Sequence, residues 1–137
     1  MKRWLVKSEP GAWSWDDQVR DGVTAWTGVR NYQASNFLKA MKVGDRCFFY
    51  HSVNEKRIVG IVEVVREAYP DPTSDDPRWV CPDLKAVAPV PHPVALADIK
   101  ADPRLADMAL IRQSRLSVMP VDDASWGIIC GLAGVAS

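Results

Sequence analysis

Short runs of apolar residues alternate with polar ones along most of the chain, and their spacing distinguishes strands from helices. Runs with a period of two, rich in β-branched and aromatic residues, are typical of strands. Runs of this kind predict strands at residues 3–7, 24–26, 46–51, 58–65, 79–87 and 117–121. The short polar loop 52–56 between two of them predicts a hairpin.

Capping residues mark the ends of the predicted helices. Ser14 is followed three residues later by Asp17, which is the pattern of a capping box, so a helix is expected to begin there and to end at Gly22. A second helix is predicted over residues 31–41, where apolar residues recur at helical spacing. Further helical segments are predicted at residues 96–100, at 103–108 and from the cap Asp122 to Leu132.

The mixture of strands and short helices predicts the fold class. Strands of five to eight residues interspersed with short helices are typical of α+β domains. We expect about five to six strands that curl into a partly closed β-barrel with short flanking helices. The sequence has no internal repeat or low-complexity linker, so residues 1–137 are predicted to form a single domain.

Composition and hydropathy narrow the class of protein. The chain is 47% hydrophobic and 25% charged, which is typical of globular cytosolic proteins. The first ten residues lack the apolar run of a secretory signal. The uncharged apolar stretch 127–136 is shorter than the ~20 residues of a membrane span, so we expect a buried helix there. These features predict a cytoplasmic protein that does not enter a membrane.

Cysteines and charge limit the possible chemistry. Cys47, Cys81 and Cys130 are far apart and lack metal-site spacing, so we expect buried free thiols with no metal and no disulfide. The chain has 17 basic and 17 acidic residues, but basic residues are in excess before residue 67 and acidic residues after it. This polarity permits one basic face that engages few phosphates, unlike a strongly basic nucleic-acid binder.

Several segments in a fixed order resemble a known family. They are KSEP at 7–10, WTGVRNYQA at 26–34, GDRCFFYHS at 44–52, IVGIVEVVREAYPDPT at 58–73 and RQSRLSVMPV at 112–121. Together they resemble the EVE domain, whose eukaryotic members are the thymocyte nuclear proteins. The resemblance implies a PUA-like fold, related to the YTH readers of methylated adenine. It also implies a non-catalytic module that binds DNA or RNA and recognises a modified base, with modified cytosines as the leading candidates.

The resemblance singles out residues at the end of the first predicted strand and in the loop that begins at Trp26. Trp26 corresponds to a tryptophan that forms a wall of the methyl-base cage in YTH-like domains, and base stacking requires such a flat apolar surface. Trp26 could instead be a core residue. Lys7 and Ser8 correspond to a pair beside that cage, although a surface lysine and a turn-capping serine would give the same pattern.

Other candidates combine donors with aromatic rings. Arg30 suits a phosphate contact and Asn31 a base edge, although Asn31 could simply cap the following helix. His51 shares a strand face with Cys47 and Phe49, which favours a structural role, while the resemblance makes it a candidate pocket residue.

Two further sets of residues could complete the site. Tyr69 and Trp79 could supply a second aromatic wall, although Trp79 begins a predicted strand and could be a core residue. Arg112 and Arg115 lie just before the last strand and could contact the nucleic-acid backbone.

Two rival functions stay open at this point. A related branch of PUA-like proteins suggests a hydrolase that acts on an acylated cytosine, with Lys7 and either Glu63 or Glu9 as its acid–base groups. No spacing in the sequence brings these residues together. The other rival is a protein-interaction module, which would present an exposed apolar patch without a pocket. We expect a monomer with no cofactor, no metal and no catalytic residue.

Overall fold

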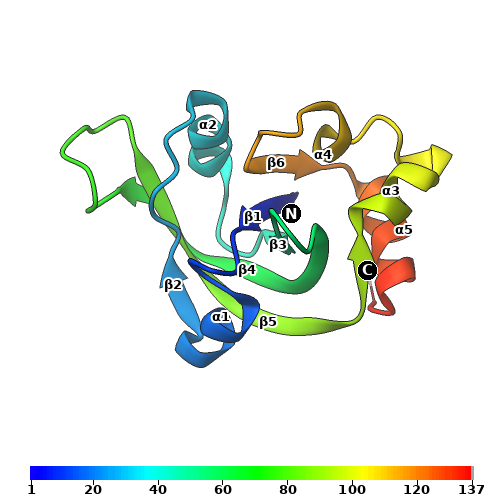
Figure 1. The fold of residues 1–137 in the computed structure, drawn as a ribbon. Helices are drawn as coiled ribbons and strands as arrows, with labels where there is room; N and C mark the ends of the chain where they lie inside the picture. The colour runs from blue at the N-terminus through cyan, green and yellow to red at the C-terminus, as the bar shows by residue number, and fades with distance from the viewer. Residues whose placement is uncertain (137) are drawn as a thin grey trace.

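A computed structural model describes residues 1–136 of the protein, which form one mixed β-sheet surrounded by helices (Figure 1). The six strands lie in the order β2-β5-β4-β3-β1-β6, and the sheet is curved but does not close. This architecture confirms the predicted α+β class and the partly closed arrangement of strands. The strands are β1 (Arg3–Ser8), β2 (Val23–Ala25), β3 (Arg46–His51), β4 (Arg57–Pro70), β5 (Val80–Ala95) and β6 (Val118–Val121).

The first strand lies inside the sheet, between one parallel and one antiparallel neighbour. β1 runs parallel to β3, with Lys7 opposite Tyr50 and Ser8 opposite His51, and antiparallel to β6. Because β1 and β3 are parallel, their carboxyl ends meet at the same edge of the sheet. This pairing brings the predicted site residues Lys7, Ser8 and His51 together.

β4 and β5 pair as a hairpin, are both longer than predicted and wrap around the rest of the sheet (Figure 1). The prediction ended the fifth strand at residue 87, yet β5 continues through several prolines to Ala95. Four register shifts interrupt the β4–β5 ladder. Such bulges bend a strand and allow positions without an N–H donor. Trp79 precedes β5, which begins at Val80, so the predicted start at Trp79 was one residue early.

Side-chain caps begin three of the helices as the sequence predicted. Ser14 and Asp17 form the capping box, while Asn31 and Asp122 cap the helices that follow them. One four-residue helix that begins at Ala109 was not predicted. The α-helices are α1 (Trp15–Asp21), α2 (Tyr32–Ala40), α3 (Leu96–Ala101), α4 (Ala109–Arg112) and α5 (Asp123–Ala133), and a 3-10 helix covers Pro103–Leu105.

Gln18 is a polar residue on the buried face of α1. Its side chain is fully buried. The Gln18 amide accepts a hydrogen bond from Trp13 Nε1 at 2.9 Å and donates to the carbonyl oxygens of Leu84 and Gly22. Because these bonds satisfy the buried amide, the polar residue is tolerated and ties α1 to β5.

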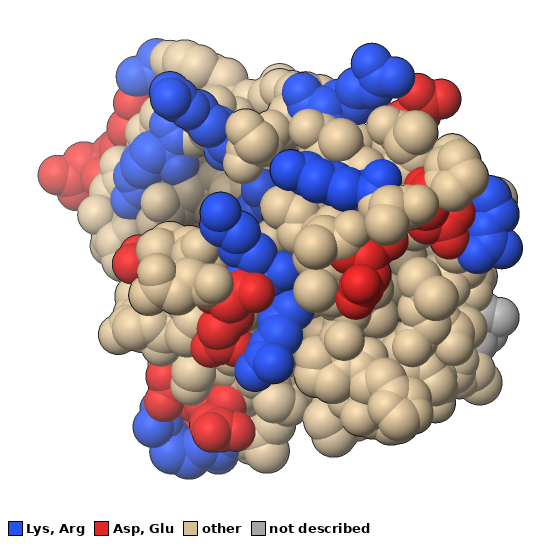
Figure 2. All heavy atoms as spheres, turned by 45° about the vertical axis from the view of Figure 1, so that its right-hand side comes forward, with Lys and Arg blue, Asp and Glu red and all other residues tan. Residues whose placement is uncertain are grey.

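Charges of both signs are spread over the surface. Figure 2 shows lysine and arginine side chains in a broken band across one face, with groups of carboxylates beside them. Many arginines pair locally, and Arg20, Arg78, Arg104 and Arg112 each contact a carboxylate at most five residues away. Because of this pairing, the face shown in Figure 2 has no large area of purely positive or purely negative charge.

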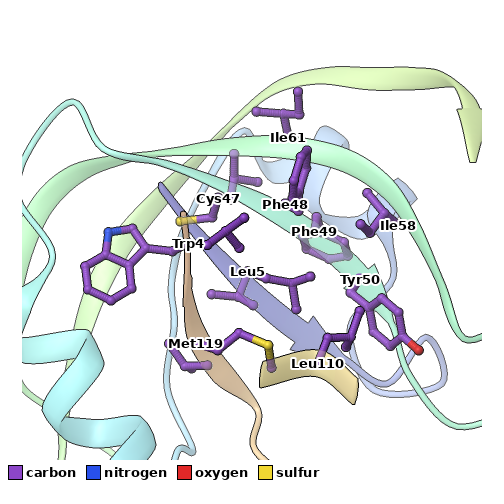
Figure 3. Close-up of a cluster of buried hydrophobic side chains, with 14 of the residues drawn as sticks. Trp4, Leu5, Cys47, Phe48, Phe49, Tyr50, Ile58, Ile61, Leu110 and Met119 are labelled. Atoms are coloured by element: carbon purple, nitrogen blue, oxygen red, sulfur yellow. The ribbon is translucent and has the colours of Figure 1, made fainter. Parts of the chain in front are cut away.

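The hydrophobic core is centred on β3, which contributes side chains to both faces of the sheet (Figure 3). Cys47, Phe48, Phe49 and Tyr50 are all buried, although they point alternately to opposite faces. Trp126 of α5 stacks on Phe48 with ring centroids 3.8 Å apart. β3 is therefore covered on both sides.

The described cysteines are unpaired, as expected from their spacing. All three cysteines are free and buried, and burial raises the pKa of the Cys47 thiol, so it stays protonated. Within residues 1–136, no helix has the length and apolar character needed to cross a bilayer.

Candidate nucleic-acid interface

A hollow of about 530 Å³ opens where the end of β1 meets the segment before α1 and the loop after β2. Four of the predicted site residues line it, namely Lys7, Ser8, Trp26 and Arg30. We refer to this hollow, together with its further lining residues Glu9, Trp13, Thr24, Thr27 and Ser117, as the Trp26 pocket. A larger hollow of about 750 Å³ lies around Trp4 and Phe37 and contains none of the predicted residues, so size alone does not identify the site.

Trp26 forms one wall of the pocket and also packs on the core. Its ring lies edge-on to Phe49 with centroids 5.6 Å apart, and only 8% of the residue is exposed. Its backbone N–H donates to the Pro82 carbonyl at 2.9 Å. Trp26 is therefore a core residue that also lines the hollow, with the Phe49 ring of β3 behind it, and its contact with a base stays a prediction.

Trp13 is a second aromatic residue of the pocket that the sequence analysis did not select. The bond from its Nε1 to Gln18 Oε1 fixes the ring, and the Arg20 guanidinium lies 5.8 Å from the ring centroid. Ser8 Oγ donates to the Trp13 carbonyl oxygen and so anchors this segment to β1. The one available signal was the position of Trp13 directly before the predicted helix cap, close to the Lys-Ser pair.

Lys7 places a cation at the rim of the pocket. Its ammonium donates to the Ser114 carbonyl at 2.9 Å and lies 5.7 Å from the centre of the Tyr50 ring. Partial burial lowers the pKa of Lys7 from its ordinary value. The side chain is therefore held in one place between the Trp26 pocket and the loop before β6.

Arg30 is oriented by a buried carboxylate. Its Nη1 donates to Asp71 Oδ2 at 3.0 Å and its Nη2 donates to Thr73 Oγ1 at 2.8 Å. Asp71 also accepts bonds from Gly28 N and from Thr73. Burial alone would raise the pKa of the Asp71 carboxyl, but the bonds from Thr73, Gly28 and Arg30 lower it well below its usual range. Asp71 thus stays ionised and fixes the loop that follows Trp26.

The conformation of that loop depends on Gly28. Gly28 has a φ of 87°, which side chains other than glycine rarely adopt. In this conformation its N–H donates to Asp71 at 2.9 Å. The WTGVR segment therefore turns sharply between the Trp26 wall and Arg30.

His51 lies behind the pocket. Its Nε2 accepts a hydrogen bond from Trp15 N at 2.9 Å, and its Nδ1 lies 3.0 Å from Glu55 Oε1. The ring packs edge-on against Phe49, which in turn supports Trp26. Since both ring nitrogens are engaged and the residue does not line the pocket, this arrangement fits the structural role.

Asn31, Arg112 and Arg115 lie together in a neighbouring groove of about 380 Å³. Asn31 Oδ1 accepts a bond from Ala34 N and caps α2, so its amide NH₂ is the group left for a ligand. Arg112 pairs with Asp107, whereas Arg115 makes no ion pair among residues 1–136. This groove adjoins the pocket through Lys7, which donates to Ser114.

Tyr69 and Trp79 do not line the Trp26 pocket. The Tyr69 hydroxyl donates to Asp83 across the β4–β5 hairpin, and Arg66 covers its ring at 3.7 Å. Trp79 packs against Tyr32 with centroids 5.2 Å apart, and Arg30 lies 5.9 Å from its ring centre. Trp79 therefore lies beside the pocket behind Arg30, while Tyr69 braces the hairpin.

Comparison with known proteins identifies the family. The model of the EVE domain family matches residues 2–132, almost the whole chain. The chain belongs to the EVE domain family. This EVE domain is 33% identical to human thymocyte nuclear protein 1 over 168 aligned residues, which cover 94% of this chain and 72% of that protein.

Solved structures agree with this assignment. The protein Rpa0253 from Rhodopseudomonas palustris, 55% identical, superposes with a TM-score of 0.93 over 98% of this chain and 94% of that one. Human thymocyte nuclear protein 1, in a complex with DNA containing 5-methylcytosine, gives a TM-score of 0.90 at 33% identity with full coverage of both chains. A YTH domain from Zygosaccharomyces rouxii, 14% identical with a TM-score of 0.62 over 99% of this chain and 89% of its own, shares the fold.

Proposed function

We propose that this EVE domain binds a nucleic acid and takes one modified base, a modified cytosine, into the Trp26 pocket. The observation that carries the proposal is the pocket itself, in which two indole rings line a hollow that has a lysine and an arginine at its rim. The human relative whose structure contains DNA with 5-methylcytosine supports the choice of base.

The pocket suits a base that has left its stack. Trp26 and Trp13 line the pocket with aromatic rings, and stacking on aromatic rings stabilises a bound base by ~1–3 kcal/mol. The volume of about 530 Å³ lies within the range of small-ligand sites. A base inside a duplex cannot reach such a wall, so a double-stranded ligand would have to extrude its nucleotide.

The charged residues would position the backbone. Lys7 and Arg30 stand at the rim, and Arg115 lies in the adjoining groove. Because Asp71 holds Arg30 at a fixed place, the guanidinium is preorganised for a phosphate or base edge. Phosphate contacts set the register, and the pocket would select the base.

Binding without turnover is part of the proposal. Acid–base catalysis requires groups within hydrogen-bond reach of the reacting atoms. The structure brings Lys7 and Glu9 to the same pocket, as the hydrolase alternative would require. The Lys7 ammonium, however, donates to the Ser114 carbonyl, and no hydrogen bond among residues 1–136 joins it to Glu9.

A titration panel tests the proposal. We would measure binding of 5-methylcytosine, 5-hydroxymethylcytosine and unmodified cytosine in matched single- and double-stranded oligonucleotides, at one stated salt concentration. The expected result is tighter binding of one modified oligonucleotide than of its unmodified counterpart, weakened in Trp26→Phe. Equal affinity for every oligonucleotide, or no binding at all, would overturn the proposal.

A further inference from the structure

We propose that a second, smaller hollow next to the Trp26 pocket binds a phosphate of the nucleic-acid backbone. This hollow has a volume of about 230 Å³, and three lysines, Lys7, Lys56 and Lys100, line it. We refer to it as the lysine hollow. The assignment of its phosphate to the nucleotide held in the Trp26 pocket rests on the proposed function.

The lysine hollow has a charge unlike that of the surface in general. Its lining contains three ammonium groups and no carboxylate. The neighbouring acid Glu55 is already engaged by His51 and Arg57, each at 3.0 Å. None of the three lysines forms an ion pair with a carboxylate among the described residues. Three unneutralised cations around one cavity attract an anion.

Hydroxyl groups complete the donors of the hollow. Tyr50, Ser52 and Ser114 lie in its lining beside the lysines. Partial burial raises the pKa of the Tyr50 hydroxyl, so it stays protonated and able to donate. The oxygens of a phosphodiester only accept hydrogen bonds. Ammonium and hydroxyl groups donate them, so this lining suits a phosphate of the nucleic-acid backbone.

Two backbone hydrogen bonds and one from a side chain join the distant segments that build the hollow. Ser52 N donates to the Ser8 carbonyl, and Leu96 N donates to the Lys56 carbonyl at 2.8 Å. The second bond holds the β3–β4 loop against α3, which carries Lys100. Lys7 Nζ closes the third side by donating to the Ser114 carbonyl. The lysines therefore converge because the tertiary structure fixes the segments that carry them.

The loop that carries Lys56 is strained. Val53 and Lys56 have φ values of 70° and 51°, in the left-handed region. A β-branched residue there is an outlier, and backbone strain of this kind is concentrated at functional sites. Glycine would relieve this backbone strain, but glycine at position 56 would remove the ammonium group from the hollow.

Lys7 connects the two sites. It lines both the Trp26 pocket and the lysine hollow, with its ammonium between them. A base in the pocket and its own or an adjacent phosphate in the hollow would thus lie on either side of one side chain. This arrangement predicts that a nucleotide binds more tightly than the corresponding nucleoside.

The first experiment uses inorganic phosphate alone. Amide chemical shifts of ¹⁵N-labelled protein would be followed as phosphate replaces chloride at constant ionic strength. We expect saturable shifts around Ser52, Lys56 and Lys100 that are lost in the Lys56→Gln/Lys100→Gln variant. Lys39→Gln, which changes an exposed lysine of α2 outside the hollow, is the matched control. Non-saturable shifts, or saturable shifts that the double variant retains, would overturn the phosphate site.

The second experiment assigns the phosphate to the bound nucleotide. Affinities for 5-methyl-2′-deoxycytidine and for its 3′- and 5′-monophosphates would be compared in the same variants. One monophosphate should bind roughly five-fold more tightly than the nucleoside to the wild-type protein. That advantage should disappear in Lys56→Gln/Lys100→Gln, with unchanged nucleoside affinity, and persist in Lys39→Gln.

The outcomes separate this inference from the proposed function. A monophosphate advantage that survives loss of both lysines would overturn the inference and leave base binding in place. Phosphate bound in the hollow of a protein that binds no modified nucleoside or oligonucleotide would overturn the proposed function. In that case the assignment to a backbone phosphate fails with it, and the hollow is an anion site of another kind.

Discussion

The guanidinium of Arg30 lies 3.0 Å from the carboxylate of Asp71, 41 residues further along the chain, and that carboxylate is fully buried. Asp71 also accepts the Gly28 N–H, so a single side chain fixes both ends of the turn that follows Trp26. Because a buried carboxylate is stable only when its partners are in place, the loop and the carboxylate depend on each other.

The first prediction concerns the pH dependence of this contact. Since the pKa of Asp71 is lower in the folded chain than in the unfolded chain, the ionised carboxylate stabilises the fold at neutral pH. This contribution is complete above about pH 5, begins to fall as the pH drops below about 4, and is lost only as the pH passes through the much lower pKa of the folded chain. Asp71→Asn should therefore cost about 1–3 kcal/mol at pH 7 and progressively less as the pH falls from about 4 to about 2 in urea unfolding.

Asp75→Asn is the matched control for that measurement. Asp75 is an exposed acid in the same loop, and the substitution should change the free energy of unfolding little at either pH. An equal loss for Asp71→Asn at about pH 2 and at about pH 7 would show that the charge of Asp71 does not stabilise the loop.

The second prediction separates the two roles of Trp26. Trp26→Phe retains an aromatic ring against Phe49 but reduces the surface in the pocket. It should weaken binding of the modified base by about 1 kcal/mol, and Trp26→Ala by ~1–3 kcal/mol with added loss of stability. Trp126→Phe, a buried tryptophan stacked on Phe48 outside the pocket, should lower stability without changing affinity. Equal binding losses in both phenylalanine variants would argue against a pocket role for Trp26.

The third prediction concerns salt. The net charge is zero, and the sequence predicts phosphate contacts at Lys7, Arg30, Arg112 and Arg115. Lys56 and Lys100 would share the phosphate of Lys7 in the lysine hollow, so they add no further phosphate to this count. If two to four contacts form, the logarithm of the association constant should fall against that of salt concentration with a slope of about −1.4 to −3.6. Titrations at four or more salt concentrations measure this slope. A slope near about −8 would require an extended basic surface instead.

The fourth prediction concerns the packing of α1 on the sheet. A Cβ at Gly60 would lie 2.5 Å from the Trp15 ring, which itself packs edge-on against Phe49. Gly60→Ala should therefore destabilise the protein by about 1–3 kcal/mol in thermal or urea unfolding. Gly127→Ala in α5 meets nothing within 4 Å and should instead be neutral or stabilising, because alanine favours helix. The packing argument fails if the two variants are equally stable.

The fifth prediction is that the protein releases bound bases without altering them chemically. Trp26 and Trp13 would stack on the base, and Arg30 would donate hydrogen bonds to it without exchanging protons at neutral pH. Incubation with N4-acetylcytidine, 5-methylcytosine and 5-hydroxymethylcytosine, followed by mass spectrometry, should return each compound intact. Protein-dependent loss of any of them that Lys7→Ala abolishes would establish a hydrolase.

Local features of the fold could be predicted from the sequence because they depend on neighbouring residues. The caps at Ser14, Asn31 and Asp122 form as expected, since each bond reaches only three residues along the chain. β3 begins and ends where the alternation of Arg46–His51 predicted. The predicted fifth strand stopped short of the end of β5, whose prolines are accommodated by register shifts that depend on the partner strand.

The sequence by itself determined the periods of the strands and helices, their caps, the family resemblance and the choice of Trp26 as a candidate. Only the tertiary structure decided which side chains meet. Arg30 and Asp71 are 41 residues apart and Lys7 and Ser114 are 107 apart, so no local pattern links them. The parallel pairing of β1 with β3 and the curvature of the sheet bring these segments together, and hydrogen bonds between their backbones and side chains then fix the two hollows.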